Sequence, residues 1–476
     1  MTRHTRFRAA ILLAVSLVVV LAAAAVSAEE PEGTIPAGEA LDPRIVGGTE
    51  VDPPGKYPFI VALVFADEPD AYWGQYCAGT LLDPWWVMTA GHCVSFADAN
   101  RASEIDVVVG RHDLRNGTDG ERIGVADIVR HPGYDNQTLA NDLALLRLER
   151  AATAGTPVTL ATAADAGLFE AGDPATVIGW GFTQGNPPGT PNYPDTLREV
   201  VVPIVSDTDC TNAYGSDLIL PDQICAGDLA NGGIDSCFGD SGGPLFVDNG
   251  GAYVHVGIVS TGNECALPGF PGIYTRTATY ATWVADTMAA NPVPTCNGHD
   301  ATLLGSIWDD VLEGTAGDDV IFARSGADTI NGLGGADLIC AGPGADWIDA
   351  GDGDDIVLGG PGDDYILGGL GNDRLGGSLG NDRLLGGDGN DRLLGSIGDD
   401  LAMGELGNDL IRGGAGADRL LGGDAADVIV GNIGDDDING GAGDDKLVGA
   451  AGYDILRGGL DIDYCLTGED VICELP

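Results

Sequence analysis

Gly239-Asp240-Ser241-Gly242-Gly243-Pro244 places one serine in a tight turn that is rich in glycine. Taken alone, this composition is typical of an ordinary turn. Three other segments make a catalytic role for this serine the better interpretation. In chain order they add a second glycine pair, a histidine and an aspartate. They are Ile45-Val46-Gly47-Gly48, Thr89-Ala90-Gly91-His92-Cys93 and Asn141-Asp142-Leu143-Ala144-Leu145-Leu146. A histidine, an aspartate and a serine in this order predict nucleophilic catalysis by the serine hydroxyl.

The patterning from Ile45 to about Asn291 predicts strands, since short Val- and Ile-rich runs alternate with turns. The stretch from Tyr280 to Ala290 has neither glycine nor proline and predicts a helix. The four motifs and their separations resemble the chymotrypsin/trypsin family, from Ile45 to about Ala290. This resemblance implies an all-β fold in which two six-stranded antiparallel β-barrels hold the catalytic site between them.

The resemblance also implies a role for each catalytic residue. His92 acts as the general base that takes the proton of Ser241, and it later protonates the leaving amine. Asp142 holds the tautomer of the histidine ring and stabilises its charged form. The backbone N–H groups of Gly239 and Ser241 form the oxyanion hole. No cofactor is expected for this chemistry.

A zymogen is expected from the segment around Ile45. In the resembled family, cleavage before Ile-Val-Gly-Gly frees an amino group that inserts beside the aspartate preceding the catalytic serine. Here this implies cleavage between Arg44 and Ile45, followed by an ion pair between Ile45 and Asp240. Arg44 is a residue that such an enzyme accepts, so self-activation is also expected. The alternative is that Asp240 only caps a turn.

Substrate preference is expected to depend on Asp235, six residues before Ser241. It matches the base of the primary specificity pocket in the resembled family, whose walls here come from Ser260, Gly262 and Gly272. A buried carboxylate in an open slot selects Arg or Lys, since an apolar guest leaves it unpaired. We therefore expect polypeptide substrates with Arg or Lys before the cut bond. One alternative is that Asp235 is a solvated surface residue. Another is relaxed or chymotrypsin-like specificity, but a carboxylate at this position argues against it.

The N-terminus predicts export. Three arginines precede an apolar run from Ala9 to Val26, and Val26-Ser27-Ala28 has the small residues of a cleavage site. We therefore expect a signal peptide over 1–28, an activation propeptide over 29–44, and a secreted, extracellular protein. An uncleaved membrane anchor is the alternative, because the apolar run is long. The net charge of −51 excludes nucleic acid as a partner, because phosphate binding needs a basic face.

Ten cysteines in an exported chain predict disulfides, although their spacing does not determine how they pair. The family resemblance implies three pairs, which are Cys77–Cys93, Cys210–Cys225 and Cys237–Cys265. Two further pairs are hypotheses that would pin the two ends of the C-terminal region, namely Cys296–Cys340 and Cys465–Cys473.

The chain repeats from Gly305 onward. Gly305 to Leu466 is 162 residues, which divide into eighteen units of nine with no insertion. Every unit has Asp at its sixth place and an apolar residue or, once, a cysteine at its eighth place. The units resemble the RTX nonapeptide repeat, which implies a parallel β-roll over 305–466. The predicted domains are then a protease domain over 45–291, a linker over 292–304, the roll, and a C-terminal cap over 467–476.

Calcium is the expected ligand of the roll. Carboxylates and backbone carbonyls are the hard oxygen ligands that calcium takes, and glycines allow the tight turns between them. Without calcium the aligned carboxylates repel one another, so we expect metal binding to be coupled to folding. The candidate ligands are Asp319, Asp337, Asp346, Asp355, Asp364, Asp373, Asp382 and Asp391.

These features together predict a secreted, trypsin-like serine endopeptidase that is made as a zymogen. Its calcium-folded tail is expected to serve stability, or attachment to a cell surface or a polysaccharide. The alternative is a calcium-binding adhesion or matrix protein with minor or altered proteolytic activity. The sequence makes no prediction of an oligomeric state.

Overall fold

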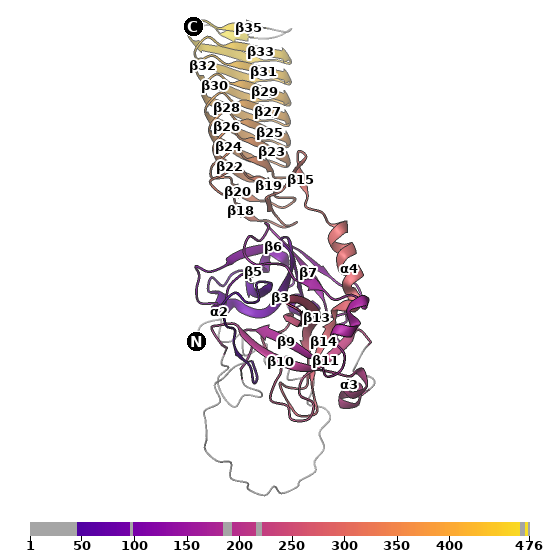
Figure 1. Ribbon diagram of the computed structural model, residues 1–476. Helices are drawn as coiled ribbons and strands as arrows, with labels where there is room; N and C mark the ends of the chain where they lie inside the picture. Colours follow the sequence, from indigo (N-terminus) through magenta and orange to yellow (C-terminus); the bar gives the residue numbers. More distant parts are fainter. Residues whose placement is uncertain (1–44, 96–98, 184–192, 216–220, 467–471, 475–476) are drawn as a thin grey trace, which may run out of the picture. The chain divides into compact units, whose positions relative to one another are not determined.

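The computed structural model describes residues 45–95, 99–183, 193–215 and 221–466, and the backbone of 472–474 (Figure 1). The predicted signal peptide and propeptide, including Arg44, lie outside these described residues. Within the described part of the chain, no helix combines the length and the hydropathy needed to cross a bilayer.

The first β-barrel consists of six antiparallel strands that close on themselves. In barrel order they are β2 (Ile60–Phe65), β3 (Gln75–Asp83), β4 (Trp86–Thr89), β7 (Ala144–Leu148), β6 (Glu121–Arg130) and β5 (Ile105–Val109). Side chains of β2 alternate between two apolar clusters, as the period of a strand requires. Val61 and Leu63 fill this barrel, whereas Ala62 and Val64 pack in the cluster that contains Phe246 of the second barrel. An apolar seam therefore joins the two barrels.

The second β-barrel also consists of six antiparallel strands. It closes because its first strand pairs both with its second strand and with its last. In barrel order they are β9 (Pro174–Gly179), β10 (Arg198–Val205), β11 (Gln223–Ala226), β14 (Gly272–Arg276), β13 (Ala252–Thr261) and β12 (Pro244–Asn249). Two short strands extend this sheet, β1 (Thr49–Glu50) beside β10 and β8 (Thr159–Leu160) beside β13. The expected pair of six-stranded barrels is confirmed.

Helices are few. They are α2 (Ala71–Gly74), α3 (Asp207–Tyr214) and α4 (Thr277–Ala290), with 3₁₀ turns at Gly91–Val94, Ala102–Glu104 and Ala163–Leu168. The predicted helix over 280–290 is α4, which begins three residues earlier than expected. It buries Tyr280 and Val284, which are four residues apart and so lie on one helix face.

The C-terminal region is a roll of two parallel ten-stranded sheets, preceded by the hairpin β15 (Thr295–Cys296) and β16 (His299–Asp300) (Figure 1). One sheet contains β17 (Leu303–Leu304), β19 (Val320–Phe322), β21 (Leu338–Cys340), β23 (Ile356–Pro361), β25 (Arg374–Leu379), β27 (Arg392–Ile397), β29 (Leu410–Ala415), β31 (Val428–Ile433), β33 (Lys446–Ala451) and β35 (Tyr464–Leu466). The other contains β18 (Val311–Glu313), β20 (Thr329–Asn331), β22 (Trp347–Asp352), β24 (Tyr365–Leu370), β26 (Arg383–Asp388), β28 (Leu401–Leu406), β30 (Arg419–Asp424), β32 (Asp437–Ala442), β34 (Ile455–Leu460) and β36 (Ile472–Glu474). The predicted parallel β-roll is confirmed.

Each turn of the roll takes two repeat units, so residues 18 apart face each other across paired strands. Ile366, for example, pairs with Leu384 in the next strand of its sheet. Eighth-place side chains from Leu312 to Leu456 point inward and form one continuous apolar core. Hydrophobic burial along the roll therefore comes mainly from a single narrow column of side chains, with one residue contributed by each unit.

Disulfides cross-link the molecule at four described places. The three pairs implied by the family resemblance form, and so does the hypothesised Cys296–Cys340. Cys465 is also disulfide-bonded, but the side chain of Cys473 lies outside the described residues, so that pairing stays a hypothesis.

Removing a side chain from the core column should destabilise the roll far more than removing the same side chain from its surface. Ile366→Ala leaves a cavity in the core, and we expect a loss of about 2–5 kcal/mol in the free energy of unfolding. Ile397→Ala is the matched control, because Ile397 is 56% exposed, and we expect a change within about 0.5 kcal/mol. Urea unfolding followed by circular dichroism measures both, and equal losses would contradict the inward assignment.

Candidate active site

His92 lies just beyond the end of β4. The strand ends at Thr89, and a single 3₁₀ turn, Gly91–Val94, carries the histidine. The Cys77–Cys93 disulfide ties this turn to β3. The position of the histidine is therefore determined by the first barrel.

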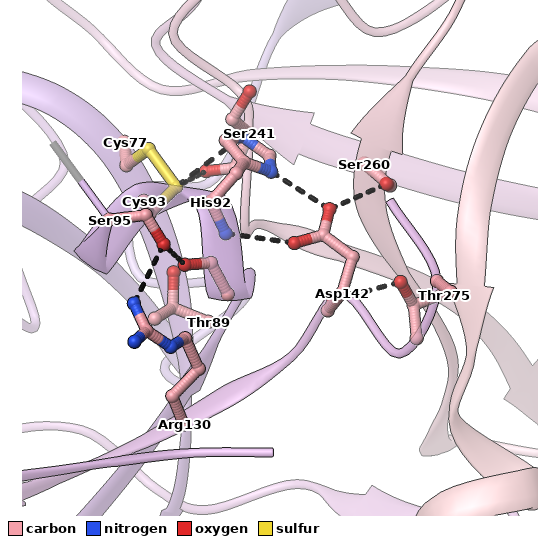
Figure 2. A network of polar contacts seen from close by, with 12 residues as sticks. Cys77, Thr89, His92, Cys93, Ser95, Arg130, Asp142, Ser241, Ser260 and Thr275 are labelled. Carbon is pink, nitrogen blue, oxygen red and sulfur yellow. Dashed lines mark hydrogen bonds and ion pairs between the residues drawn. A yellow bond between two sulfur atoms is a disulfide. The ribbon is translucent and has the colours of Figure 1, made fainter. Parts of the chain in front are cut away.

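Asp142 approaches His92 from the loop before β7 (Figure 2). The distance from His92 Nδ1 to Asp142 Oδ2 is 2.8 Å, and the backbone N–H of His92 donates to Asp142 Oδ1 at 2.8 Å. One carboxylate oxygen thus holds the ring while the other holds the main chain. Because an ionised carboxylate only accepts hydrogen bonds, the contact places the proton on Nδ1 and leaves Nε2 to accept one.

Two strands of the second barrel complete the hydrogen bonds of Asp142 (Figure 2). Ser260 Oγ in β13 donates to Asp142 Oδ2 at 2.6 Å, and Thr275 Oγ1 in β14 donates to the backbone carbonyl of Asp142 at 2.9 Å. Ser260 was expected only in the wall of the specificity pocket, so this contact is additional. Sequence reasoning missed Thr275, because no motif distinguishes it from other threonines in strands.

Burial and charge act in opposite directions on this pair. Asp142 is 0% exposed, and burial raises its pKa, but the neighbouring His92 and the hydrogen bonds hold that pKa below its ordinary value. Burial lowers the pKa of His92, whereas the charge and hydrogen bond of Asp142 raise it, with a net rise. The pair therefore favours an ionised aspartate beside a histidine that binds a proton readily.

Ser241 belongs to the second barrel, in the turn that leads into β12. The N–H of Ala78 in β3 donates to the carbonyl oxygen of Ser241 at 2.7 Å. Cys93 Sγ lies 3.5 Å from that oxygen and 3.7 Å from His92 Nε2. The structure thus brings the three predicted catalytic residues together beside the Cys77–Cys93 disulfide, with contributions from both barrels (Figure 2).

Asp235 is a buried carboxylate that lies against Gly272. It is 3% exposed, and its oxygens accept the N–H groups of Ser236 at 2.8 Å and Ala266 at 3.1 Å. A Cβ on Gly272 would lie 2.6 Å from Asp235 Oδ1, and a Cβ on Gly262 would lie 3.9 Å from the Cα of Gly272. Glycine at both positions keeps the approach to the carboxylate open. Burial raises the pKa of Asp235 to about 7.

Asp240 has no contact with water. Its oxygens accept the N–H groups of Gly181 at 2.8 Å and Cys237 at 2.9 Å, and burial raises its pKa to about 7. Ile45 is also fully buried and packs in the apolar cluster of the second barrel. The N–H of Asp235 donates to the carbonyl of Val46 at 3.2 Å, so the Ile45 segment lies against the segment that carries Asp235.

The sixth-place aspartates of the roll share one arrangement. Oδ1 accepts the backbone N–H of the aspartate 18 residues earlier, as Asp346 does from Asp328 at 2.8 Å. Oδ2 is buried without a hydrogen-bond partner among the described residues in Asp328, Asp337, Asp346, Asp355, Asp364, Asp373, Asp382, Asp391, Asp400, Asp409, Asp418, Asp427, Asp436, Asp445, Asp454 and Asp463. A Cβ on Gly368 would lie 2.5 Å from Asp373 Oδ2, so glycine leaves the space beside the oxygen free. Free carboxylate oxygens in such turns fit a hard cation.

The first two units of the roll differ from the rest. Asp310 Oδ1 accepts the hydroxyl of Ser306 at 3.0 Å, and Asp319 Oδ2 accepts the hydroxyl of Thr315 at 2.9 Å and its N–H at 2.6 Å. Ser306 and Thr315 stand at the second place of the unit, which is glycine in the resembled repeat. Asp319 was predicted as a calcium ligand, but its carboxylate already has partners within its own turn.

Several buried sixth-place carboxylates of the roll have raised pKa values. Burial raises the pKa of Asp364 and of Asp373 to about 7, and the charges of the aspartates 18 residues before and after them add to this effect. A cation beside these oxygens would relieve both penalties.

Comparison with known protein families matches both regions of the chain. The trypsin model matches residues 45–284, and the model of the RTX calcium-binding nonapeptide repeat matches six segments between residues 308 and 465, some of which overlap. The matched ranges agree with the two-barrel region and with the roll. The tail is accordingly a calcium-binding repeat region.

Curated relatives match the first region over nearly their whole length. Trypsin-1 of Astacus astacus is 36% identical over 241 residues, which are 50% of this chain and 98% of the relative. Trypsin II-P29 of Gallus gallus is 37% identical over 53% of this chain and 92% of the relative. Trypsin 5G1 of Aedes aegypti is 41% identical over 51% of this chain and 84% of the relative. The chain therefore belongs to the trypsin family of serine proteases, with RTX calcium-binding repeats in its C-terminal region.

Proposed function

We propose that this serine protease is a secreted endopeptidase that cleaves polypeptides after Arg or Lys, and that it is made as a zymogen. The observation that carries the specificity is Asp235, a buried carboxylate that lies against Gly272, where no side chain stands before it. A guanidinium or ammonium group that reaches this carboxylate would pair with it. Four disulfides among the described residues support an oxidising, extracellular location.

The acylation step follows from the contacts around His92. Ser241 Oγ attacks the carbonyl carbon of the scissile bond while His92 Nε2 takes its proton. The resulting imidazolium is stabilised by Asp142, which is already ionised and in contact with Nδ1. The carbonyl oxygen becomes an oxyanion, which the N–H groups of Gly239 and Ser241 stabilise. His92 then gives the proton to the leaving amine, the C–N bond breaks, and an acyl-enzyme remains.

Deacylation reverses the proton movement. A water molecule takes the place of the amine, His92 removes its proton, and the hydroxide attacks the acyl carbon. The proton returns from His92 to Ser241 Oγ as the ester bond breaks. Asp142 stays ionised throughout, since its role is to orient the ring and stabilise its charged form.

Turnover of an arginine anilide by the full chain, cleaved after Arg44 in calcium buffer, tests the proposal. We expect rapid, Arg-selective hydrolysis beside a phenylalanine anilide, and a loss of about 10⁶-fold in kcat for Ser241→Ala. Asp235→Asn should lower kcat/KM for the arginine anilide by about 10⁴-fold, because the substrate cation loses its partner.

Asp248→Asn is the matched control for Asp235→Asn, because it removes an exposed carboxylate of β12 and should leave kcat/KM unchanged. If Asp235→Asn retains wild-type selectivity for arginine, the specificity proposal is wrong. If the wild-type chain turns over neither anilide although Ile45 is its N-terminus, the peptidase proposal fails and an adhesion protein becomes the better assignment.

Activation is proposed to occur by cleavage between Arg44 and Ile45, after which the new amino group pairs with buried Asp240. Arg44→Gln should keep the chain uncut and leave the rate of anilide hydrolysis at background. N-terminal sequencing alongside the assay checks both effects. Ser241→Ala, with Arg44 intact, separates self-cleavage from cleavage by another protease, because only a self-cleaving chain then stays uncut. An uncut Arg44→Gln chain with wild-type activity would refute the zymogen proposal.

Calcium is proposed to bind at sixth-place aspartates whose Oδ2 has no partner among the described residues, including Asp328 and the predicted Asp337, Asp346, Asp355, Asp364, Asp373, Asp382 and Asp391. We leave Asp319 out of this set because Thr315 already donates to its carboxylate. Bound calcium would compensate the buried charges and so stabilise the folded roll. The folded roll is proposed to serve the stability of the protein or its attachment to a surface.

The pH dependence of the roll should reverse when calcium is removed. Burial raises the pKa of Asp364 and Asp373 to about 7, well above the ordinary value of an aspartate, so the calcium-free folded roll binds more protons than the unfolded chain. Its stability should therefore rise as pH falls from 8 to 5, most steeply at about pH 5 to 6, between the pKa of the unfolded chain and that of the folded roll. In saturating calcium, acidification should instead destabilise the roll, because protons compete with the metal.

Thermal unfolding of the full chain, followed by circular dichroism in EDTA and in calcium, measures this reversal. Asp364→Asn should weaken the calcium-induced rise in Tm, whereas Asp363→Asn changes an exposed fifth-place carboxylate and should not. The same pH trend in both buffers would show that these carboxylates are not the calcium ligands.

A further inference from the structure

The N–H groups of Gly239 and Ser241 are assigned to the oxyanion hole. Each is oriented by a hydrogen bond to the carbonyl oxygen of the same peptide group, which points the opposite way. The N–H of Phe182 donates to the carbonyl of Phe238 at 2.8 Å. In a trans peptide the N–H points away from the carbonyl, so this contact directs the N–H of Gly239 toward the other side. The N–H of Gly243 donates to the carbonyl of Asp240 at 2.9 Å, which directs the next oxyanion donor in the same manner.

The peptide group between Gly239 and Asp240 is held by a side chain. Gln75 Nε2, in β3, donates to the carbonyl oxygen of Gly239 at 2.7 Å and lies 3.2 Å from the carbonyl oxygen of Cys77. Gln75 is 6% exposed, so water does not readily replace its contact. Of these three consecutive peptides, the middle one alone depends on a side chain for the partner of its carbonyl.

That dependence matters because of the backbone at Gly239. Its φ of +100° lies in a region that only glycine occupies readily, and glycine has little intrinsic preference to stay there. Removing Gln75 would leave the Gly239 carbonyl without its donor, which costs free energy at this partly buried position. The residue would then be free to rotate toward other partners, and its N–H would turn with it.

We propose that Gln75 is a positioning residue for the oxyanion hole, acting by holding the carbonyl of Gly239 from the first barrel. The proposal rests on the proposed peptidase function, because it concerns the rate of the same reaction. Gln75 touches neither the substrate cation nor the catalytic serine hydroxyl. Its loss should therefore affect the charged intermediate and leave the specificity pocket intact.

Gln75→Met keeps the length of the side chain and removes its N–H donors. Losing an oxyanion donor outright costs about 10²–10³ in kcat, so a misoriented donor should cost about 10- to 100-fold, with KM little changed. A peptide arginine aldehyde tests the oxyanion directly, because Ser241 adds to it and forms one. Its inhibition constant should rise in step with the fall in kcat. The inhibition constant of benzamidine, which occupies only the specificity pocket, should stay the same.

Two further variants keep the test sharp. Gln75→Asn retains the amide but is one methylene too short to reach 2.7 Å, so it should reproduce the defect. Thr277→Val removes the hydroxyl of another buried side chain, which donates to the backbone carbonyl of His255 away from the site. This variant should change neither inhibition constant.

Unchanged kcat and aldehyde affinity in Gln75→Met would overturn the proposal, and so would an equal loss of benzamidine affinity, which indicates general damage to the site. A wild-type chain that neither turns over the arginine anilide nor binds the aldehyde defeats the proposed function instead. The two failures are therefore distinguishable.

Discussion

A carboxylate that leaves water needs a positive partner or several hydrogen bonds, and this requirement recurs throughout the molecule. Asp142 meets it with His92, Ser260 and a backbone N–H. Asp235 and Asp240 accept hydrogen bonds but contact no cation among the residues that the structure describes, and burial raises the pKa of both. Under the proposed function, chain cleavage supplies the cation for Asp240 and the substrate supplies it for Asp235. The roll repeats the same problem from Asp328 onward and, as a calcium-binding repeat, solves it with metal.

The seam between the barrels is where these requirements meet. The first barrel contributes His92 and the loop of Asp142, whereas the second contributes Ser241 and the hydroxyls that hold Asp142. β3 crosses the seam, because its Ala78 N–H holds the carbonyl of Ser241. The apolar packing of Ala62 and Val64 with the second barrel keeps this geometry rigid. The site consequently depends on the packing of two separately closed sheets.

Much of this arrangement was predictable from the sequence. The triad motifs, the paired barrels, three disulfide pairs and the parallel roll all follow from local patterns or from family resemblance. Thr275 and Gln75 were not predictable, because each acts through one hydrogen bond to a backbone carbonyl of a distant segment. Such contacts depend on how strands meet in space, so no periodic pattern in the sequence indicates them. Asp319 shows the same limit, since the effect of Thr315 on it depends on the conformation of their shared turn.

The hydroxyls of Ser306 and Thr315 also bear on how the roll begins to form. They supply donors to Asp310 and Asp319, which are thereby accommodated without metal. Parallel repeats fold by adding each new turn to an existing one, so the first turn is the hardest to form. Cys296–Cys340 cross-links this same end of the roll. The first turn therefore depends less on calcium than the turns after it, whose buried carboxylates lack such donors.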